Sequence, residues 1–197
     1  MKENKLIIAS SNKGKISEFQ EILPNFKCIP QSVFNISDVE ETGKDFEENA
    51  VLKAKNAFMK TNIPSVGDDS GLIVPAINNE PGLYSARYAG LNATDSDNRK
   101  KLISKLKERK LESTYAYFFC CIVIAGVKDE NDVIVCSGKV EGLIKTFERG
   151  EKGFGYDSMF YPEGYSDSFA ELNSLEKNEI SHRGVALKKL IDKLNKA

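Results

Sequence analysis

The stretches "STYAYFFCCIVIAGV" at residues 113–127 and "DVIVCSGKVEGLIKTF" at residues 132–147 decide the fold. Both are rich in β-branched and aromatic residues, which favour strands. Each is far longer than the ~5–6 residues of an ordinary strand. The polar turn "KDEND", residues 128–132, lies between them. We therefore expect a hairpin of two long strands, with Gly126, Gly138 and Gly142 as points where the strands bend.

The residues before this hairpin alternate between strand and helix patterns. "KLIIAS", residues 5–10, predicts a buried opening strand, and "GKISEFQEILPNF", residues 14–26, has apolar residues at helical spacing until Pro24. After a loop at 36–45, residues 46–60 have one apolar and one charged face, as in an amphipathic helix. Short strands are expected on either side of an acidic turn. They are "IPSVG", residues 63–67, and "GLIVPAI", residues 71–77.

The remaining segments follow the same logic. Residues 78–95 are rich in Gly, Asn and Pro and predict an irregular loop, followed by a surface helix capped at Thr94 or Asp95. A glycine-rich loop after residue 147 leads into a short strand, and the last helix is expected to begin at a Ser181 cap. No repeat and no linker interrupts the chain. This order predicts an α/β fold with one large mixed sheet and flanking helices, over a single two-lobed domain of residues 1–197.

The composition limits the function. The chain has 28 basic and 29 acidic residues and a net charge of -1, which argues against a protein that grips long DNA or RNA. The four cysteines include no C-x-x-C pair, and three lie in strand-like runs, so we expect buried reduced thiols. No apolar run approaches the ~20 residues of a membrane span, and no signal-peptide core is present. We expect a cytoplasmic enzyme or binding protein.

The first candidate for chemistry is "SSNKGK", residues 10–15, which follows a strand and opens a helix. Backbone N–H groups at a helix start attract phosphate, and hydroxyl and lysine side chains can add hydrogen bonds. The spacing is neither that of a P-loop nor that of a dinucleotide fingerprint. The alternative is an ordinary Ser/Asn cap with solvated lysines.

The second candidate consists of two acidic pairs on separate segments, Glu40 with Glu41 and Asp68 with Asp69. Mg²⁺ binds through one or two carboxylates together with substrate phosphates, so these pairs are suitable donors. The alternative is surface charge in turns.

Two further segments carry groups that suit a purine base. In "GFGYD", residues 153–157, Phe154 or Tyr156 could stack on a base and Asp157 could accept hydrogen bonds. In "EKNEISHRG", residues 176–184, the only histidine, His182, stands beside Arg183. A single histidine leaves no material for a two-histidine zinc site. The alternatives are core aromatics at a bend and a structural or exposed histidine.

Taken together, these segments resemble the inosine triphosphate pyrophosphatase family. The resemblance rests on "SSNKGK", "EETGKDFEENAVLKAKNA", "DDSGL", "PGLYSARYAG", "KGFGYD" and "EKNEISHRGVAL", in this order and spacing. It covers the chain from residue 6 to about residue 195. Members of that family hydrolyse non-standard purine nucleoside triphosphates. The resemblance implies an elongated mixed sheet, two lobes around a central nucleotide-binding cleft, and a homodimer.

The resemblance also implies roles for particular residues. Asp69 is expected to be the general base and, with Glu40, a ligand of Mg²⁺, while Glu41 and Asp68 support them. The expected substrate-binding residues are Ser10, Ser11, Asn12, Lys13, Gly14, Lys15, Lys53, Ser70, Phe154, Gly155, Tyr156, Asp157, Lys177, His182 and Arg183. Two positions depart from the family pattern, Ser11 in place of the common Gly and Ser158 in place of the common Pro. We expect altered rates from these two changes.

The expected reaction is Mg²⁺-dependent hydrolysis of ITP, dITP and XTP to the monophosphate and pyrophosphate. Donors from His182 or Arg183 would suit the C6 carbonyl of inosine and xanthosine and would leave the amino group of adenine mispaired. Two alternatives stay open. One is a related nucleotide pyrophosphatase with pyrimidine or methylated substrates, and the other is a non-enzymatic nucleotide-binding or nucleic-acid-binding module.

Overall fold

The computed structural model describes residues 4–127 and 132–195. The chain forms two compact units. The first contains Met1–Asp69, Cys120–Gly138 and Arg183–Ala197, and the second contains Ser70–Phe119 and Lys139–His182. The expected "KDEND" turn lies outside the described residues except for Asp132. Within the described ranges, no helix is long and apolar enough to cross a membrane.

One mixed sheet runs through the fold, and its strands have the order β2-β1-β3-β5-β6-β7, with β4 paired to β3. Its strands are β1 (Lys5–Ile8), β2 (Lys27–Pro30), β3 (Ser65–Val74), β4 (Glu80–Pro81), β5 (Ser113–Ala125), β6 (Val133–Lys145) and β7 (Phe160–Pro162). β1 pairs in parallel with both β2 and β3, whereas β7 pairs antiparallel with β6 and β4 antiparallel with β3. The predicted α/β class is confirmed, and the two long strands β5 and β6 are neighbours as expected.

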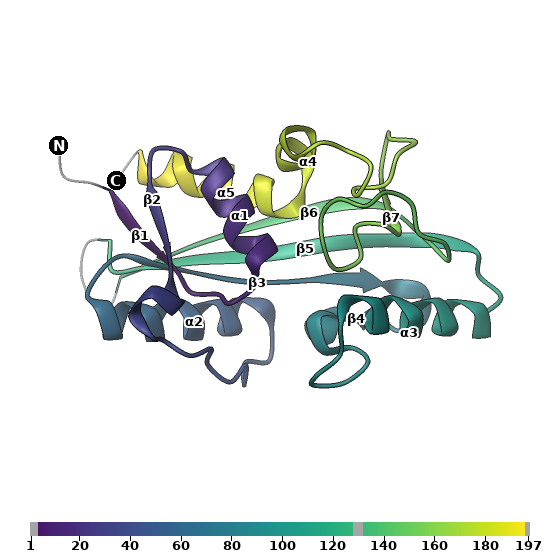
Figure 1. The fold of residues 1–197 in the computed structure, drawn as a ribbon, viewed down its shortest axis with the longest axis horizontal. Coiled ribbons are helices and arrows are strands. Elements are labelled where there is room, and N and C mark those ends of the chain that lie inside the picture. The colour runs from purple at the N-terminus through teal and green to yellow at the C-terminus, as the bar shows by residue number, and fades with distance from the viewer. Residues whose placement is uncertain (1–3, 128–131, 196–197) are drawn as a thin grey trace. The chain divides into compact units, whose positions relative to one another are not determined.

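The first unit has helices on both faces of its part of the sheet (Figure 1). The helices are α1 (Lys13–Ile22), α2 (Phe46–Thr61) and α5 (His182–Leu194). Side chains alternate along β1, so Leu6 and Ile8 pack in a core with α1 and α5 on one face. Ile7 points to the other face and packs with Ala57 of α2. Strand β1 is therefore buried on both faces, between α1 and α5 on one side and α2 on the other.

The second unit has its own core, built on the other parts of β3, β5 and β6. Helix α3 (Asp95–Glu108) is capped by Thr94 and contributes Leu102 and Leu106 to this core. Phe118, Phe160 and Phe169 pack against one another there, with ring centroids 4.8 to 6.1 Å apart. The short helix α4 (Ser174–Ile180) completes the unit. Three-residue-per-turn helices span Gln31–Phe34, Pro75–Ile77 and Gly82–Arg87.

Three features differ from the sequence prediction. The expected acidic turn at Asp68 and Asp69 is wrong: both residues lie inside the continuous strand β3, and both are buried. Strand β2 was not predicted, because its sequence "KCIP" is short and half-buried. Helix α4 was not predicted. Ser181 follows it, with its backbone N–H donating to the carbonyl of Lys177, and α5 begins at the next residue, as expected.

All four cysteines are free thiols, as predicted. Cys120, Cys121 and Cys136 are buried, and Cys28 is half-buried. Burial raises the pKa of the Cys28 thiol to about 11, which keeps it protonated at neutral pH.

Candidate active site

The loop between β1 and α1 ends in a side-chain cap at the start of α1. Asn12 is the N-cap of α1, and its side-chain oxygen accepts a hydrogen bond of 3.0 Å from the backbone N–H of Lys15. The hydroxyl of Ser10 accepts the N–H of Asn12 at 3.1 Å. Lys13 and Gly14 occupy the first turn, where backbone N–H groups have no partner within a helix. The structure thus shows the Asn12 cap, and a cap of this kind leaves backbone N–H groups that can bind phosphate.

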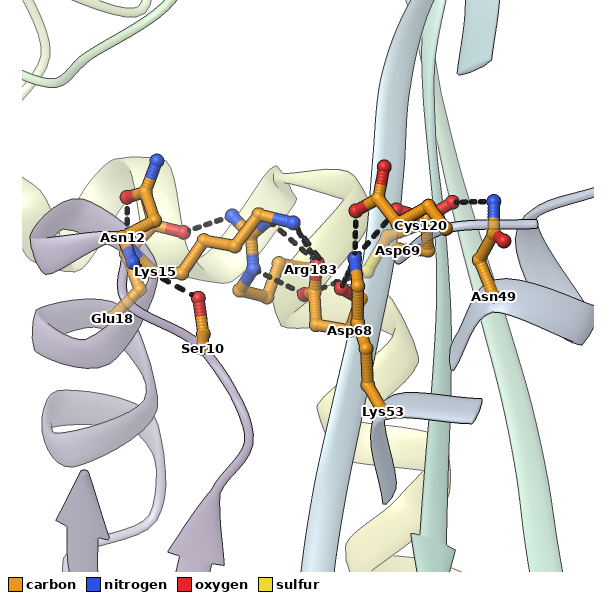
Figure 2. A network of polar contacts seen from close by, with 11 residues as sticks. Ser10, Asn12, Lys15, Glu18, Asn49, Lys53, Asp68, Asp69, Cys120 and Arg183 are labelled. Atoms are coloured by element: carbon orange, nitrogen blue, oxygen red, sulfur yellow. Dashed lines mark hydrogen bonds and ion pairs between the residues drawn. The ribbon is translucent and has the colours of Figure 1, made fainter. Parts of the chain in front are cut away.

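Asp68 lies at the centre of a buried polar cluster in the first unit (Figure 2). Its carboxylate accepts hydrogen bonds from the guanidinium of Arg183 at 2.7 and 3.3 Å, and from Lys15 Nζ. Arg183 is almost fully buried and also donates to Glu18 of α1. The thiol of Cys120 lies 3.2 Å from Asp68 Oδ2. Asp68 therefore ties the start of α1 and the start of α5 to β3.

Asp69 belongs to a second cluster, which contacts helix α2. Lys53 Nζ lies 2.9 Å from Asp69 Oδ1 and also contacts Glu41 Oε1. Asn49 Nδ2 donates to Asp69 Oδ2 at 3.1 Å. The ammonium of Lys53 is thus placed between two carboxylates, Asp69 and Glu41. This is the position in which a cation is most stabilised.

The two adjacent aspartates have opposite pKa shifts. Burial alone would raise the pKa of Asp68, but the charges of Arg183 and Lys15 hold it well below its usual value. Burial raises the pKa of Asp69, and the nearby Glu41 carboxylate adds to this although Lys53 opposes it. Burial alone would lower the pKa of Lys53, but Asp69 and Glu41 raise it. Asp68 is an anion at neutral pH, whereas Asp69 is the carboxylate better suited to accept a proton.

The two glutamates of the acidic loop before α2 lie in different surroundings. Glu41 contacts Lys53, whereas the side chain of the neighbouring Glu40 is exposed. Ser11, one of the two departures from the family pattern, donates its hydroxyl hydrogen to Asp38 of this loop. The other oxygen of Asp38 accepts a hydrogen bond from the buried Gln31. Ser11 therefore links the turn before α1 to the loop that carries Glu40 and Glu41.

The carboxylates of this unit fit a divalent cation by the chemistry of their donor set. Asp69 and Glu41 supply oxygen donors, and Lys53 already occupies the place of a positive charge between them. Among the residues that the structure describes, no three His, Cys, Asp or Glu side chains come close enough to form a complete metal site. Mg²⁺ usually binds through one or two carboxylates together with water and phosphate oxygens, so Asp69 and Glu41 are suitable donors for it.

The predicted base loop, residues 153–157, lies in the second unit and is held by hydrogen bonds. Asp157 Oδ2 accepts the backbone N–H of Phe154 at 2.9 Å and Lys177 Nζ at 2.6 Å. The Lys177 ammonium also lies 4.9 Å from the centroid of the Phe154 ring. Tyr156 is buried and donates to the backbone carbonyl of Ser85 at 2.9 Å. Phe154, Asp157 and Lys177 therefore form one group that combines an aromatic face with a charged pair.

Three further residues singled out from the sequence also lie in the second unit. His182 is buried and stacks on Phe118, with ring centroids 4.8 Å apart and an interplanar angle of 11°. Ser70 is half-buried at the beginning of this unit. Ser158, the second departure from the family pattern, donates to Glu148 Oε2 at 3.1 Å.

Sequence reasoning missed several residues that hold the carboxylates. Asn49 contacts Asp69, and Glu18 contacts Arg183. A signal was available for both, because Asn49 is four residues before Lys53 and Glu18 is three residues after Lys15 on predicted helices. Residues at these spacings share a helix face. Cys120 gave no such signal, because its neighbours in the sequence are apolar.

A helix start with adjacent lysines, next to buried carboxylates on a strand, defines an α/β protein that handles phosphorylated ligands. The chain belongs to the Ham1 family, whose model matches residues 6–193. A protein of Legionella pneumophila (strain Lens) named dITP/XTP pyrophosphatase is 46% identical over 190 residues, covering 96% of this chain and 97% of its own.

Solved structures of the family have the same fold. A HAM1 protein from Coxiella burnetii has a TM-score of 0.87 and 42% identity, covering 98% of this chain and 99% of its own. The Ham1 protein of Staphylococcus aureus has a TM-score of 0.83 and 42% identity, covering 97% and 98%. The predicted family resemblance is confirmed.

Proposed function

We propose that this protein is a nucleoside-triphosphate pyrophosphatase that hydrolyses non-standard purine nucleotides such as dITP, ITP and XTP. The observation that carries the proposal is the juxtaposition in the first unit of Lys15, Lys53 and the two buried aspartates next to the start of α1. The relative from Legionella pneumophila, which matches almost the whole chain, is named for dITP/XTP pyrophosphatase activity.

The triphosphate is assigned to the first unit. The backbone N–H groups at the start of α1, with Ser10, Ser11 and Asn12 around them, would bind phosphate oxygens. Lys15 and Lys53 would neutralise part of the triphosphate charge, each turning from the aspartate that it now contacts. Lys13 is exposed on the same turn and adds positive charge. These three lysines supply positive charge locally although the whole chain has a net charge of -1.

The chemical step is the attack of water on the α-phosphorus. A new P–O bond forms, the bond to the bridging oxygen breaks, and pyrophosphate leaves. Asp69 would take the proton of the attacking water, because its carboxylate has a raised pKa and lies at the edge of the buried cluster. Asp68 would remain ionised and hold Lys15 and Arg183 in place.

The family is one of nucleotide pyrophosphatases, which generally need a divalent metal, and we propose Mg²⁺. Asp69 would hold the Mg²⁺ ion together with Glu40 or Glu41. The bound ion would neutralise phosphate charge and lower the pKa of water. Glu41 is favoured by its contact with Lys53, and Glu40 by the family resemblance.

The base is assigned to the second unit. Phe154 offers an aromatic face, and Lys177, Asp157 and His182 offer polar groups. We also propose that Arg183 contributes to purine recognition, as the resemblance implies, although in this structure its guanidinium is committed to Asp68 and Glu18. A homodimer and a cytoplasmic location are further predictions that follow from the resemblance.

The direct test is pyrophosphate release from a panel of eight nucleoside triphosphates, with and without Mg²⁺. We expect turnover of ITP, dITP and XTP that depends on Mg²⁺, with much less turnover of ATP, CTP and UTP. Turnover of pyrimidine or methylated nucleotides alone would indicate a related pyrophosphatase with another base preference. Salt-dependent oligonucleotide binding without any turnover would indicate the non-enzymatic alternative.

A further inference from the structure

Gly155, in the middle of the proposed base loop, is held from outside the loop by helix α3. Asp95 Oδ2 accepts the backbone N–H of Gly155 at 2.7 Å. Arg99, one turn further along the same helix, donates from Nη1 to the backbone carbonyl of Gly155 at 2.8 Å. Both backbone polar groups of one residue are therefore satisfied by two side chains of one helix face.

The conformation of Gly155 explains why the loop needs this support. Its φ is +60°, in the left-handed region that glycine adopts more readily than other residues. No strand or helix hydrogen bonds hold this part of the chain, because it lies in a turn. The two side chains of α3 take the place of those bonds and fix one conformation of the loop.

The support extends through a second charged pair. Arg99 Nε donates to Glu148 Oε2 at 2.8 Å, and Glu148 also accepts the hydroxyl hydrogen of Ser158 at 3.1 Å. Ser158 directly follows Asp157, the residue that pairs with Lys177. The contacts from α3 thus hold the loop at Gly155 and, through Glu148, at Ser158, on both sides of Asp157.

These contacts lie at a hollow in the surface of the second unit. The hollow has a volume of about 310 Å³, and its lining includes Asp95, Arg99 and Glu148 together with Phe154, Gly155 and Asp157. A change in the contacts between α3 and Gly155 therefore changes the shape of a space bordered by the proposed base-binding residues.

We propose that Asp95 and Arg99 are positioning residues that set the base preference of this protein by fixing the backbone of Gly155. The inference rests on the proposed function. It also specifies how the loop meets the purine: the N–H and C=O of Gly155 are committed to α3, so within the loop recognition falls to Phe154 and Asp157. Neither Asp95 nor Arg99 touches the substrate in this account.

The test compares Asp95→Ala with Asp97→Ala, a matched control at the same helix start. Asp97 accepts the N–H and hydroxyl hydrogen of Thr94 in the capping box and does not contact Gly155. Both variants are expected to lower the melting temperature, because both remove a carboxylate from the first turn of α3. Only Asp95→Ala should change the kinetics with nucleotides.

For Asp95→Ala we expect a KM for ITP roughly five- to tenfold higher, the size of one lost hydrogen bond, with kcat within about twofold. The ratio of kcat/KM for ITP over GTP should fall in parallel. Asp95→Asn should restore most of both values, because its carbonyl oxygen can accept the same N–H. Arg99→Met, which keeps an apolar stem of similar length, should reproduce the effect of Asp95→Ala if the latter does not fold.

Equal kinetics for Asp95→Ala and Asp97→Ala would overturn the inference and leave the proposed function intact. A wild-type protein that releases no pyrophosphate from any nucleotide would instead overturn the proposed function, and this inference with it.

Discussion

Asp68 and Asp69 are adjacent in strand β3, yet they belong to two different clusters (Figure 2). Successive side chains of a strand point to opposite faces, so Asp68 meets Lys15 and Arg183 while Asp69 meets Asn49 and Lys53. The pKa of the first is lowered and that of the second is raised. One aspartate thus maintains the structure, and the other remains available for chemistry.

Replacing Asp69 should remove activity without removing the fold. Asp69→Asn keeps the size of the side chain but loses the carboxylate that would accept the proton, so we expect the rate of pyrophosphate release to fall by roughly 10²–10⁴-fold. The melting temperature should stay close to that of the wild type, which circular dichroism would check. Full activity in this variant would refute the assigned role.

Lys53 is expected to compete with Mg²⁺ for the same carboxylates. In Lys53→Met, Asp69 and Glu41 lose the ammonium that lies between them, so a divalent cation should bind there more tightly in the absence of nucleotide. Thermal melting with increasing MgCl₂ should show a larger rise in Tm for this variant than for the wild type.

The control for Lys53→Met is Lys139→Met, which removes a lysine from an exposed pair with Glu141. NaCl at matched ionic strength separates specific binding from screening. An equal Mg²⁺ response in wild type, Lys53→Met and Lys139→Met would mean that Lys53 does not occupy the position of the cation.

Loss of the Asp68 charge should destabilise the first unit. Asp68→Asn leaves the buried Arg183 with an incomplete set of partners, and breaking such a pair costs about 3–5 kcal/mol in the free energy of unfolding. Urea unfolding at pH 7 would measure the loss. Glu141→Gln, at an exposed pair with Lys139, should leave the unfolding midpoint unchanged.

The same pair predicts a pH dependence with a definite sign. Because the pKa of Asp68 is lower in the folded protein than the usual 3.8, its contribution to stability is fully present above that value. The contribution is lost as pH falls from about 4 toward the folded pKa. The stability difference between wild type and Asp68→Asn should therefore shrink below pH 4, and a constant difference down to pH 2 would contradict the assignment.

Gly67 allows close contact between β3 and α2. A Cβ at this position would collide with the backbone carbonyl of Ala50 and the backbone N–H of Ala54, neither of which can rotate away. Gly67→Ala should therefore cost about 1–3 kcal/mol of stability by overpacking. Activity should also fall, because α2 carries Asn49 and Lys53, and steady-state kinetics with ITP would measure this. An unchanged Tm would show that the helix can move without penalty.

The sequence predicted α1, α2, α3, α5 and the two long strands because their signals are local, but it missed the seven-residue helix α4. The apolar spacing of α1 and α2 and the aromatic content of β5 need no knowledge of distant residues. The pair Asp68 and Asp69 was misplaced in a turn, because burial of two carboxylates becomes favourable only with cations from elsewhere in the chain. One of these, Arg183, lies 115 positions later.

The sequence predicted which segments carry the candidate site residues, but not which side chains contact one another. The motifs placed Lys15, Lys53 and Asp69 in one proposed site, and these three residues do lie in the same unit of the structure. The family resemblance chose Glu40 over Glu41 as the metal ligand, but the residues themselves could not, since adjacent residues in a loop have equal claims until the direction of each side chain is known. No sequence pattern indicated that Asp95 and Arg99 contact Gly155, because these hydrogen bonds are made to the backbone of a residue about 60 positions away.

The first unit is assembled from three separate stretches of chain, and the last of them begins at Arg183. On a translating ribosome, β1, α1 and α2 emerge long before the guanidinium that neutralises Asp68. A nascent chain that stops short of Arg183 must leave this carboxylate hydrated, so the unit should acquire protease resistance only late in synthesis.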